Sequence, residues 1–213
     1  MRQRIGYCAS ADGTRIAYAV MGSGPPLVRP SHWLTHLEHD LTDPVWRHVP
    51  LGLAHGRTLV RFDARGHGLS ERRPAEISFA RWVEDLEAVV DAVGLAQFDL
   101  IGISQAAASS IEYAARHPDR VRRLVLYGGF ARGPMLWSRD RATQKSRLDL
   151  ALGMVREGWD RPEERYREWF TAAFLPDGSP EQLEAFNRIQ AVSARPWPSG
   201  TCRPWPRSTC ARD

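Results

Sequence analysis

One serine stands in a spacing that suits nucleophilic chemistry. Gly102-Ile103-Ser104-Gln105-Ala106 matches the pattern G-x-S-x-G except at its last position, where alanine replaces glycine. In this pattern a strand turns sharply into a helix, and the serine is held in a strained backbone conformation with its hydroxyl exposed. Small residues on either side let the strand and the helix approach each other. The sequence therefore predicts that Ser104 is presented as a nucleophile, the alternative being an ordinary strand-to-helix turn.

The segments around this serine fit strands and helices in alternation. Residues 79–93 place apolar side chains at spacings of three and four, with Ser78 as a helix N-cap and Gly94 as the residue that ends the helix. An alanine-rich helix is expected after the serine and up to Pro118. Short apolar strands are predicted at 27–28, 58–62, 98–101 and 121–127, after a hairpin within residues 4–21. This alternation indicates an α/β fold with a mostly parallel sheet.

The second part of the chain carries helical patterns without strands. We expect helices at 139–157, from Pro162 onward and after Ser179, where Ser-Pro-Glu-Gln forms a capping box. The middle helix has a predicted apolar face made of Tyr166, Trp169, Phe170 and Ala173. Three helices after a parallel sheet indicate a lid rather than a second core. The sequence thus divides into a core at 1–133, a helical cap at 134–192 and a tail at 193–213.

The tail differs in composition from the rest of the chain. From residue 195 onward it contains four prolines and repeats the segment Arg-Pro-Trp-Pro. Neither a helix nor a strand propagates through that proline spacing. We expect residues 193–213 to be disordered and interpret them, from about residue 194, as an out-of-frame reading of a GC-rich gene. The alternative is a proline-rich ligand for an aromatic groove.

Composition and charge exclude several classes of protein. The formal net charge is +4, and the arginines of the tail account for most of it, so the body lacks the basic stripe typical of nucleic-acid binding. No apolar run approaches the roughly 18 residues that span a bilayer, and none follows Arg2 and Arg4 as a signal peptide requires. Three cysteines match neither a disulfide framework nor a metal site. We expect a cytoplasmic protein without nucleic acid, membrane, metal or cofactor.

Three further motifs, together with the serine pattern, resemble the α/β-hydrolase family. Residues 63–70 are similar to its D-x-R-G-x-G-x-S turn, and residues 115–121 are similar to its A-x-x-P-x-R-V exit from the serine helix. Pro25-Pro26-Leu27-Val28 leads into the strand before the family's oxyanion loop. The run from His32 to Glu38 is most like hydrolase domains found alone or fused to bacterial transcriptional regulators and nucleotide cyclases. The resemblance covers about residues 10–192 and implies an α/β-hydrolase sheet that lacks its last strands, with a helical lid.

The resemblance implies acyl transfer to water from a small, apolar, ester-like substrate. Ser104 would be the nucleophile, and the backbone N–H groups of Gln105 and, by position, Trp33 would hold the oxyanion. The chain departs from the family where Ser31-His32 stands in place of the usual His-Gly. Histidine accepts a positive φ more readily than most residues, which favours a preserved loop.

The base that would activate the serine is missing from its expected place. In this fold the chain order is serine, then an acid, then histidine. His117 is the only histidine after Ser104, and it is predicted about 20 Å away along the helix. His32 and His36 are either substitute bases or residues that pack the oxyanion loop, and Asp63 either braces its turn or takes part in chemistry. The chain is therefore predicted to have little or no hydrolase activity.

Two other functions stay open at this point. A non-catalytic module that binds a small molecule or regulates a partner is the alternative on the same fold, and nucleic-acid binding by the arginine tail is a third. The missing last strands also have a physical consequence. They turn the strand at 121–127 into an edge with uncovered apolar side chains, so self-association through this edge is expected.

Overall fold

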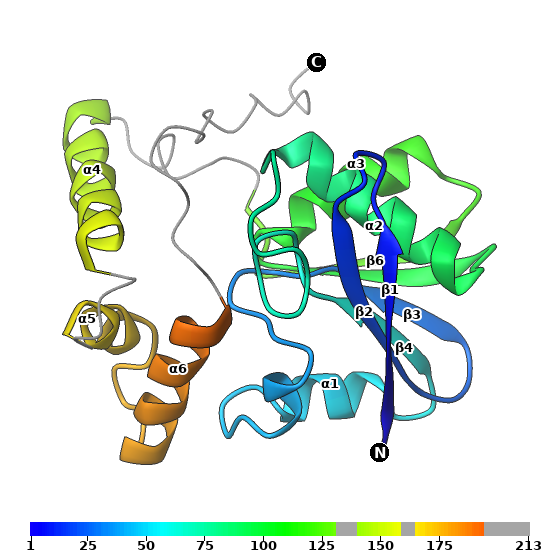
Figure 1. Cartoon of the computed structure of the whole chain (residues 1–213), viewed down its shortest axis with the longest axis horizontal. Helices are drawn as coiled ribbons and strands as arrows, with labels where there is room; N and C mark the ends of the chain where they lie inside the picture. Colours follow the sequence, from blue (N-terminus) through cyan, green and yellow to red (C-terminus); the bar gives the residue numbers. More distant parts are fainter. Residues whose placement is uncertain (131–139, 159–164, 194–213) are drawn as a thin grey trace.

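A six-stranded sheet in the order β1-β2-β4-β3-β5-β6 forms the centre of the molecule (Figure 1). The computed structural model describes residues 1–130, 140–158 and 165–193. β2 runs antiparallel to β1 and to β4, and the other neighbours run parallel to each other. The strands are β1 (Gln3–Ala9), β2 (Arg15–Gly22), β3 (Pro26–Arg29), β4 (Thr58–Phe62), β5 (Phe98–Ile103) and β6 (Val121–Tyr127). The predicted hairpin and mostly parallel sheet are confirmed.

Helices connect the parallel strands and continue beyond them. α3 lies against β5 and β6 and packs on α2, while α4, α5 and α6 stand to one side of the sheet in Figure 1. The helical elements are η1 (His39–Leu41), α1 (His48–Leu53), α2 (Phe79–Val93), α3 (Ala106–Arg116), α4 (Arg141–Gly158), α5 (Arg165–Phe174) and α6 (Pro180–Ser193). The arrangement is that of an α/β-hydrolase sheet with flanking helices.

The main core lies between the sheet and α2. The apolar stripe predicted for this helix is buried, with Val83, Leu86, Val89 and Val90 at 1% exposure or less. These side chains pack against Val28, Val60, Phe98 and Leu100 from three parallel strands. The helix begins where the Ser78 hydroxyl accepts a hydrogen bond from the Arg81 N–H, and it ends at Gly94, whose φ is 73°. Both predicted caps are therefore confirmed.

The interface between α5 and α6 is more polar than the sequence predicts. Trp169 is 47% exposed and Ala173 is exposed as well, whereas Phe170 is half-buried and packs against Phe186 of α6. The predicted apolar face is therefore confirmed at Phe170 and wrong at Trp169 and Ala173. Gln190 of α6 donates hydrogen bonds to the Arg167 carbonyl at 3.4 Å and the Thr171 hydroxyl at 2.7 Å, and both of these α5 residues are buried beside it. The capping box at Ser179 is confirmed by reciprocal bonds with Gln182.

β6 forms an open edge of the sheet. Within the described part of the chain, no strand pairs with its outer side. Its apolar side chains are correspondingly exposed, with values of 36% for Leu124, 51% for Val125, 46% for Leu126 and 71% for Tyr127. The prediction of a sheet that ends at this strand is confirmed for the described residues.

Several sequence expectations lie outside the described residues. These are the predicted boundary between core and cap at residues 133–134, the helix start at Pro162 and the tail from residue 194. No helix in the described ranges is both long and apolar enough to span a bilayer.

The close approach of β5 and α3 depends on Gly102. A Cβ atom at this position would lie 2.7 Å from the Ala107 Cα atom and 2.7 Å from the Ser110 Oγ atom. Gly102→Ala is therefore expected to lower the free energy of unfolding by about 1–3 kcal/mol. Gly52→Ala is the matched control, because a Cβ atom there meets nothing within 4 Å and lies in a helix. Urea unfolding of both variants tests this, and equal stabilities would contradict the assigned packing.

Candidate active site

Ser104 occupies the turn between β5 and α3 in the strained conformation that the sequence predicts. Its φ of 54° lies in the left-handed region, which non-glycine residues rarely adopt. Backbone hydrogen bonds hold the turn: the Ser104 N–H donates to the Tyr127 carbonyl at 2.9 Å, and its carbonyl accepts from the Ala107 N–H at 3.1 Å. The residue is exposed, and its hydroxyl has no hydrogen bond to any described residue. The hydroxyl is thus available to a ligand.

The Gln105 N–H lies next to this hydroxyl at the start of α3. A helix leaves its first N–H groups without partners inside the helix, and this N–H makes no hydrogen bond within the described residues. A hollow beside the turn is lined by Ser31, Gln105 and Ala106, together with Pro30, Phe62, Ala64, Trp82 and Ser109. The loop after β3 and the start of α3 thus face each other, as an oxyanion site requires.

Trp33 lies in the loop after β3, where the sequence places the second donor. Its indole packs edge-on against Phe170 at a centroid distance of 4.7 Å and lies 5.5 Å from Phe174, both on α5. The positive φ of this loop falls on Leu34, at 59°, and not on His32. Leu34 is buried against Phe186 of α6, and this packing offsets the strain of its backbone. The described cap helices therefore fix the loop that carries Trp33.

Both ring nitrogens of His32 make hydrogen bonds with neighbouring groups. Its Nε2 lies 2.6 Å from Arg29 Nη2, and its Nδ1 lies 2.6 Å from the Trp33 carbonyl oxygen. Because arginine only donates and a carbonyl only accepts, the imidazole is neutral with its proton on Nδ1. Burial and the nearby Arg29 lower the pKa of His32 to about 3. His32 therefore orients the Trp33 peptide and has no free site for the serine proton.

The other candidate histidines are also engaged elsewhere. His36 Nδ1 accepts from the Glu38 and His39 N–H groups, and burial lowers the pKa of His36 to about 4. His67 Nδ1 contacts the Arg65 carbonyl oxygen at 3.1 Å. His117, at the far end of α3, lies 3.4 Å from the Glu87 carboxylate. Among the described residues, none of these imidazoles makes a hydrogen bond with Ser104.

Buried polar and charged side chains hold the loop after β3. Asp63 Oδ2 accepts from the Leu37 N–H at 3.2 Å and from the Leu69 N–H at 2.9 Å. Arg61 donates to the Leu37 carbonyl and forms an ion pair with Asp40 at 2.8 Å. Leu37 is thereby fixed at both its N–H and its carbonyl. Of the two roles weighed for Asp63, these contacts support the structural one.

Sequence reasoning missed the buried arginines of this site. Arg29 and Arg61 lie side by side in the ladder between β3 and β4, and both are less than 5% exposed. Asp40 stands between them and pairs with both. A charged residue inside each short apolar strand was the available signal, because strands buried on both faces otherwise read as continuous apolar runs.

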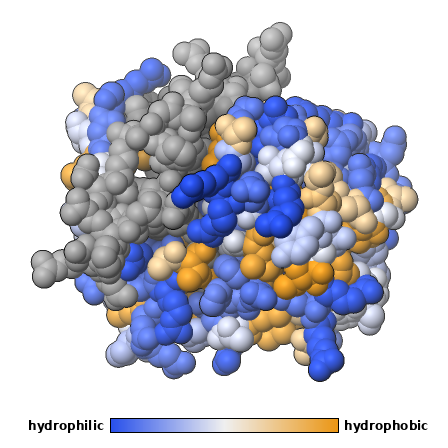
Figure 2. Space-filling model, viewed as in Figure 1, coloured by the Kyte–Doolittle hydropathy of each residue, from blue (hydrophilic) through white to orange (hydrophobic). Residues whose placement is uncertain are grey.

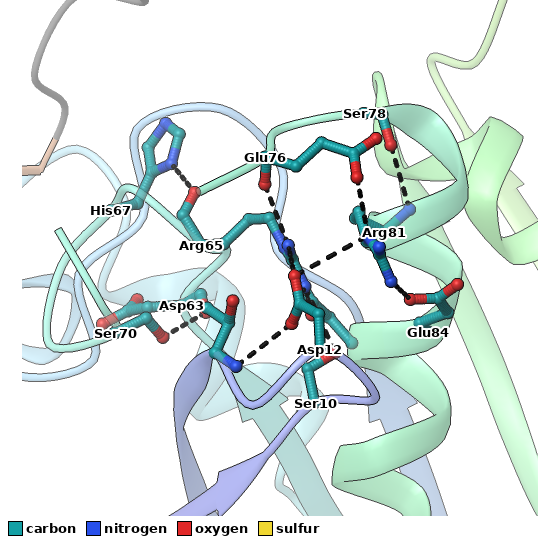
Figure 3. A network of polar contacts seen from close by, with 12 residues as sticks. Ser10, Asp12, Asp63, Arg65, His67, Ser70, Glu76, Ser78, Arg81 and Glu84 are labelled. Atoms are coloured by element: carbon teal, nitrogen blue, oxygen red, sulfur yellow. Dashed lines mark hydrogen bonds and ion pairs between the residues drawn. The ribbon is translucent and has the colours of Figure 1, made fainter. Parts of the chain in front are cut away.

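Arg65 joins three separate segments (Figure 3). Its guanidinium is fully buried and binds Asp85 of α2 through two bonds of 2.7 and 2.9 Å. It also pairs with Asp12 in the β1–β2 turn at 2.7 Å and donates to the Glu76 carbonyl at 2.9 Å. This arginine secures the turn that contains Asp63.

The described residues contain no group of three or more His, Cys, Asp or Glu side chains placed as metal ligands.

A sequence profile described as "alpha/beta hydrolase fold" matches residues 38–201. The chain belongs to this family. It is 31% identical over 142 residues to pyrrolizixenacetamide deacetylase of Xenorhabdus hominickii, covering 67% of this chain and 49% of that protein. It is 44% identical over 85 residues to 2-hydroxymuconate semialdehyde hydrolase of Pseudomonas sp. strain CF600, covering 39% and 30%.

A solved structure of a protein named as an esterase has the same fold. The esterase RhEst1 from Rhodococcus sp. ECU1013 superposes with a TM-score of 0.67 and 26% identity, covering 90% of this chain and 70% of that one. The chain spans half or less of the length of the two curated relatives above. This α/β hydrolase therefore shares the fold of its relatives over part of their length.

The strain at Ser104 predicts an unusual order of stabilities. Ser104→Gly should be more stable than Ser104→Ala by about 1–2 kcal/mol, because only glycine adopts the left-handed region without a Cβ clash. Both variants remove the hydroxyl, so thermal unfolding isolates the backbone effect. An alanine variant as stable as the glycine variant would show that the turn relaxes away from φ 54°.

Asp63 predicts a pH-dependent stability. Burial raises the pKa of Asp63 from 3.8 to about 7, so between these values the folded state holds a proton that the unfolded state has lost. The contribution of Asp63 to the free energy of unfolding therefore falls as the pH rises from about 4 to about 7. Asp63→Asn should remove this decline, which appears as the difference between two series of urea unfolding curves. A pH-independent difference would show that Asp63 is ionised throughout.

Proposed function

We propose that this α/β hydrolase is of the serine type, with Ser104 as nucleophile and a small, apolar, ester-like substrate. The observation that carries the proposal is the strained, exposed serine at φ 54° beside an N–H group that makes no other bond among the described residues. Strain of this kind persists where the surrounding structure imposes it, and it gathers at active sites. The names of two relatives, an esterase and a deacetylase, denote cleavage at an acyl group.

In the proposed reaction the Ser104 oxygen attacks the carbonyl carbon of the substrate. The Gln105 and Trp33 N–H groups would stabilise the negative charge that develops on the carbonyl oxygen. The hydroxyl proton is lost to solvent or to an added base, the bond to the leaving group breaks, and the leaving group departs as the alcohol after taking up a proton. Water then attacks the acyl-serine, which releases the acid and returns a proton to the Ser104 oxygen. The aromatic side chains around Trp33 supply an apolar wall for the acyl group.

We also propose that this chain is a slow catalyst. A serine hydroxyl is a weak nucleophile unless a base takes its proton, and the four histidines considered above are held by other partners. A positioned base contributes roughly 10²–10⁴-fold to the rate. The chain should therefore lack most of this factor.

A non-catalytic module that binds a small molecule is the second candidate. The observation that favours it is that both ring nitrogens of His32 are bonded to other groups. His32 therefore cannot act as a base for Ser104. Such a module would bind a ligand at the hollow without forming an adduct on Ser104.

Rescue by a free base tests the proposed nucleophile. Turnover of p-nitrophenyl acetate and butyrate is measured with and without added imidazole, in the wild type and in Ser104→Ala. After the Ser104→Ala rate is subtracted, we expect imidazole to raise the turnover rate. The increase should stay below the roughly 10²–10⁴-fold that a positioned base contributes. Rapid turnover without imidazole that Ser104→Ala abolishes would show that a base is present.

A fluorophosphonate probe distinguishes the two candidate functions. We expect slow labelling that intact-mass and peptide analysis place on Ser104 and that Ser104→Ala abolishes. Ligand binding without any adduct, with and without imidazole, would favour the non-catalytic module. Gly52→Ala serves as a control, because this exposed residue of α1 lies outside the proposed site and a Cβ atom there meets nothing within 4 Å.

A further inference from the structure

The outer edge of β6 presents hydrogen-bonding groups in a regular pattern. The Tyr127 carbonyl accepts from the Ser104 N–H at the end of β5, so the backbone groups of Tyr127 face the sheet. Along a strand these groups point alternately to the two sides. The N–H and carbonyl groups of Leu124 and Leu126 therefore point outward, where no described strand pairs with them. A register shift opposite Phe98 and Asp99 interrupts the alternation at Arg122. Two donors and two acceptors thus stand in a row beside exposed apolar side chains.

We propose that this edge is the contact between two copies of the chain, joined by antiparallel pairing of β6 with the partner's β6. Two identical edges related by a two-fold axis perpendicular to the sheet run antiparallel. The two six-stranded sheets would then form one continuous sheet. The proposal concerns association and does not depend on the proposed function.

The spacing of the outward groups fixes the register. With Leu124 on the two-fold axis, Leu124 faces its own copy and Arg122 faces Leu126 of the other copy. The backbone groups of Leu124 point outward, so the pair at the axis exchanges two hydrogen bonds. The strand Val121–Tyr127 is centred on Leu124, so all seven residues find a partner.

The charges of β6 agree with this register. Arg122 and Arg123 are the charged residues of the strand, and both lie near its amino-terminal end. In the antiparallel register Arg123 faces Val125 and Arg122 faces Leu126, so no arginine stands opposite another. The two arginines also share a counter-charge within their own copy, because Asp99 lies 3.4 Å from Arg122 and 3.9 Å from Arg123.

The other open edge fits β6 less well. β1 carries exposed Ile5 and Tyr7, and the face shown in Figure 2 has apolar patches among polar surface. Its charged residue is Arg4, so β1 against β6 would bring two basic strands together. Pairing of unlike edges also leaves both outer edges open and continues into filaments. Pairing of β6 with β6 closes after two copies.

A charge-swap pair tests the register. Val125 is 51% exposed, and in the dimer it faces the partner's Arg123 in a close, non-hydrogen-bonded pair. Val125→Lys should raise the dimer dissociation constant roughly tenfold, because two like-charge pairs form per dimer. Val125→Glu should keep or strengthen the dimer through two opposite-charge pairs. Light scattering over a dilution series measures both, and Leu150→Lys on α4 is the control at an exposed apolar position outside the edge.

A single cysteine gives a second test that does not depend on affinity. Facing Cα atoms in a hydrogen-bonded antiparallel pair are about 5.5 Å apart, within the range that a disulfide spans. Leu124→Cys should therefore form a dimer under mild oxidation, with the disulfide found between two copies of the peptide that begins at residue 124. The unchanged chain, which has cysteines of its own, is the control.

Three outcomes would overturn the proposal. The first is a monomer of 24.0 kDa in light scattering of the unchanged chain at concentrations near 100 μM. The second is an equal response of Val125→Lys and Val125→Glu, which would show that Arg123 does not face this position. The third is the growth of large species that Ile5→Lys prevents, which would assign the contact to β1.

Discussion

The close packing of β5 against α3 is the constraint on which the site depends. Gly102 removes the side chain that would separate the strand from the helix, and Ala107 and Ser110 occupy the space next to it. With the strand and the helix this close, the chain must reverse direction within a few residues. Ser104 takes the positive φ that this reversal requires, and its side chain is exposed. A feature of packing thus decides where a hydroxyl becomes accessible.

The second requirement is that the loop facing this serine keeps its shape. The shape of this loop is held from the interior by Asp63 and Arg61, which bind the N–H and the carbonyl of Leu37. Asp40 in turn pairs with Arg61. A buried ion pair of this kind contributes little net stability, because the cost of removing charges from water offsets their attraction. Its effect here is to define a conformation. His32 acts in the same way, since it uses both nitrogens to hold its neighbours in the loop.

Much of the fold could be predicted from the sequence because its signals are local. The caps of α2 and α6 and the turn at Ser104 depend on a few adjacent residues and obey simple steric rules. The burial of Arg167 and Thr171 on α5 could not be predicted, because their partner Gln190 lies on another helix. The pairing of Arg29 with Arg61 and the positive φ of Leu34 were missed for the same reason. Each depends on residues distant in sequence, so the spacing within one segment could mark the arginines as unusual but could not identify their partners.

The guanidinium of Arg65 has a consequence for how the chain acquires its structure during synthesis. It joins Asp12 near the amino terminus to Asp85 in α2. A ribosome must therefore release more than sixty further residues after the first hairpin emerges before the turn of that hairpin finds its permanent anchor. Until then, the turn that bears Asp12 lacks this buried contact, although its two strands pair with each other. The turn is thus made early and anchored only once α2 has been made.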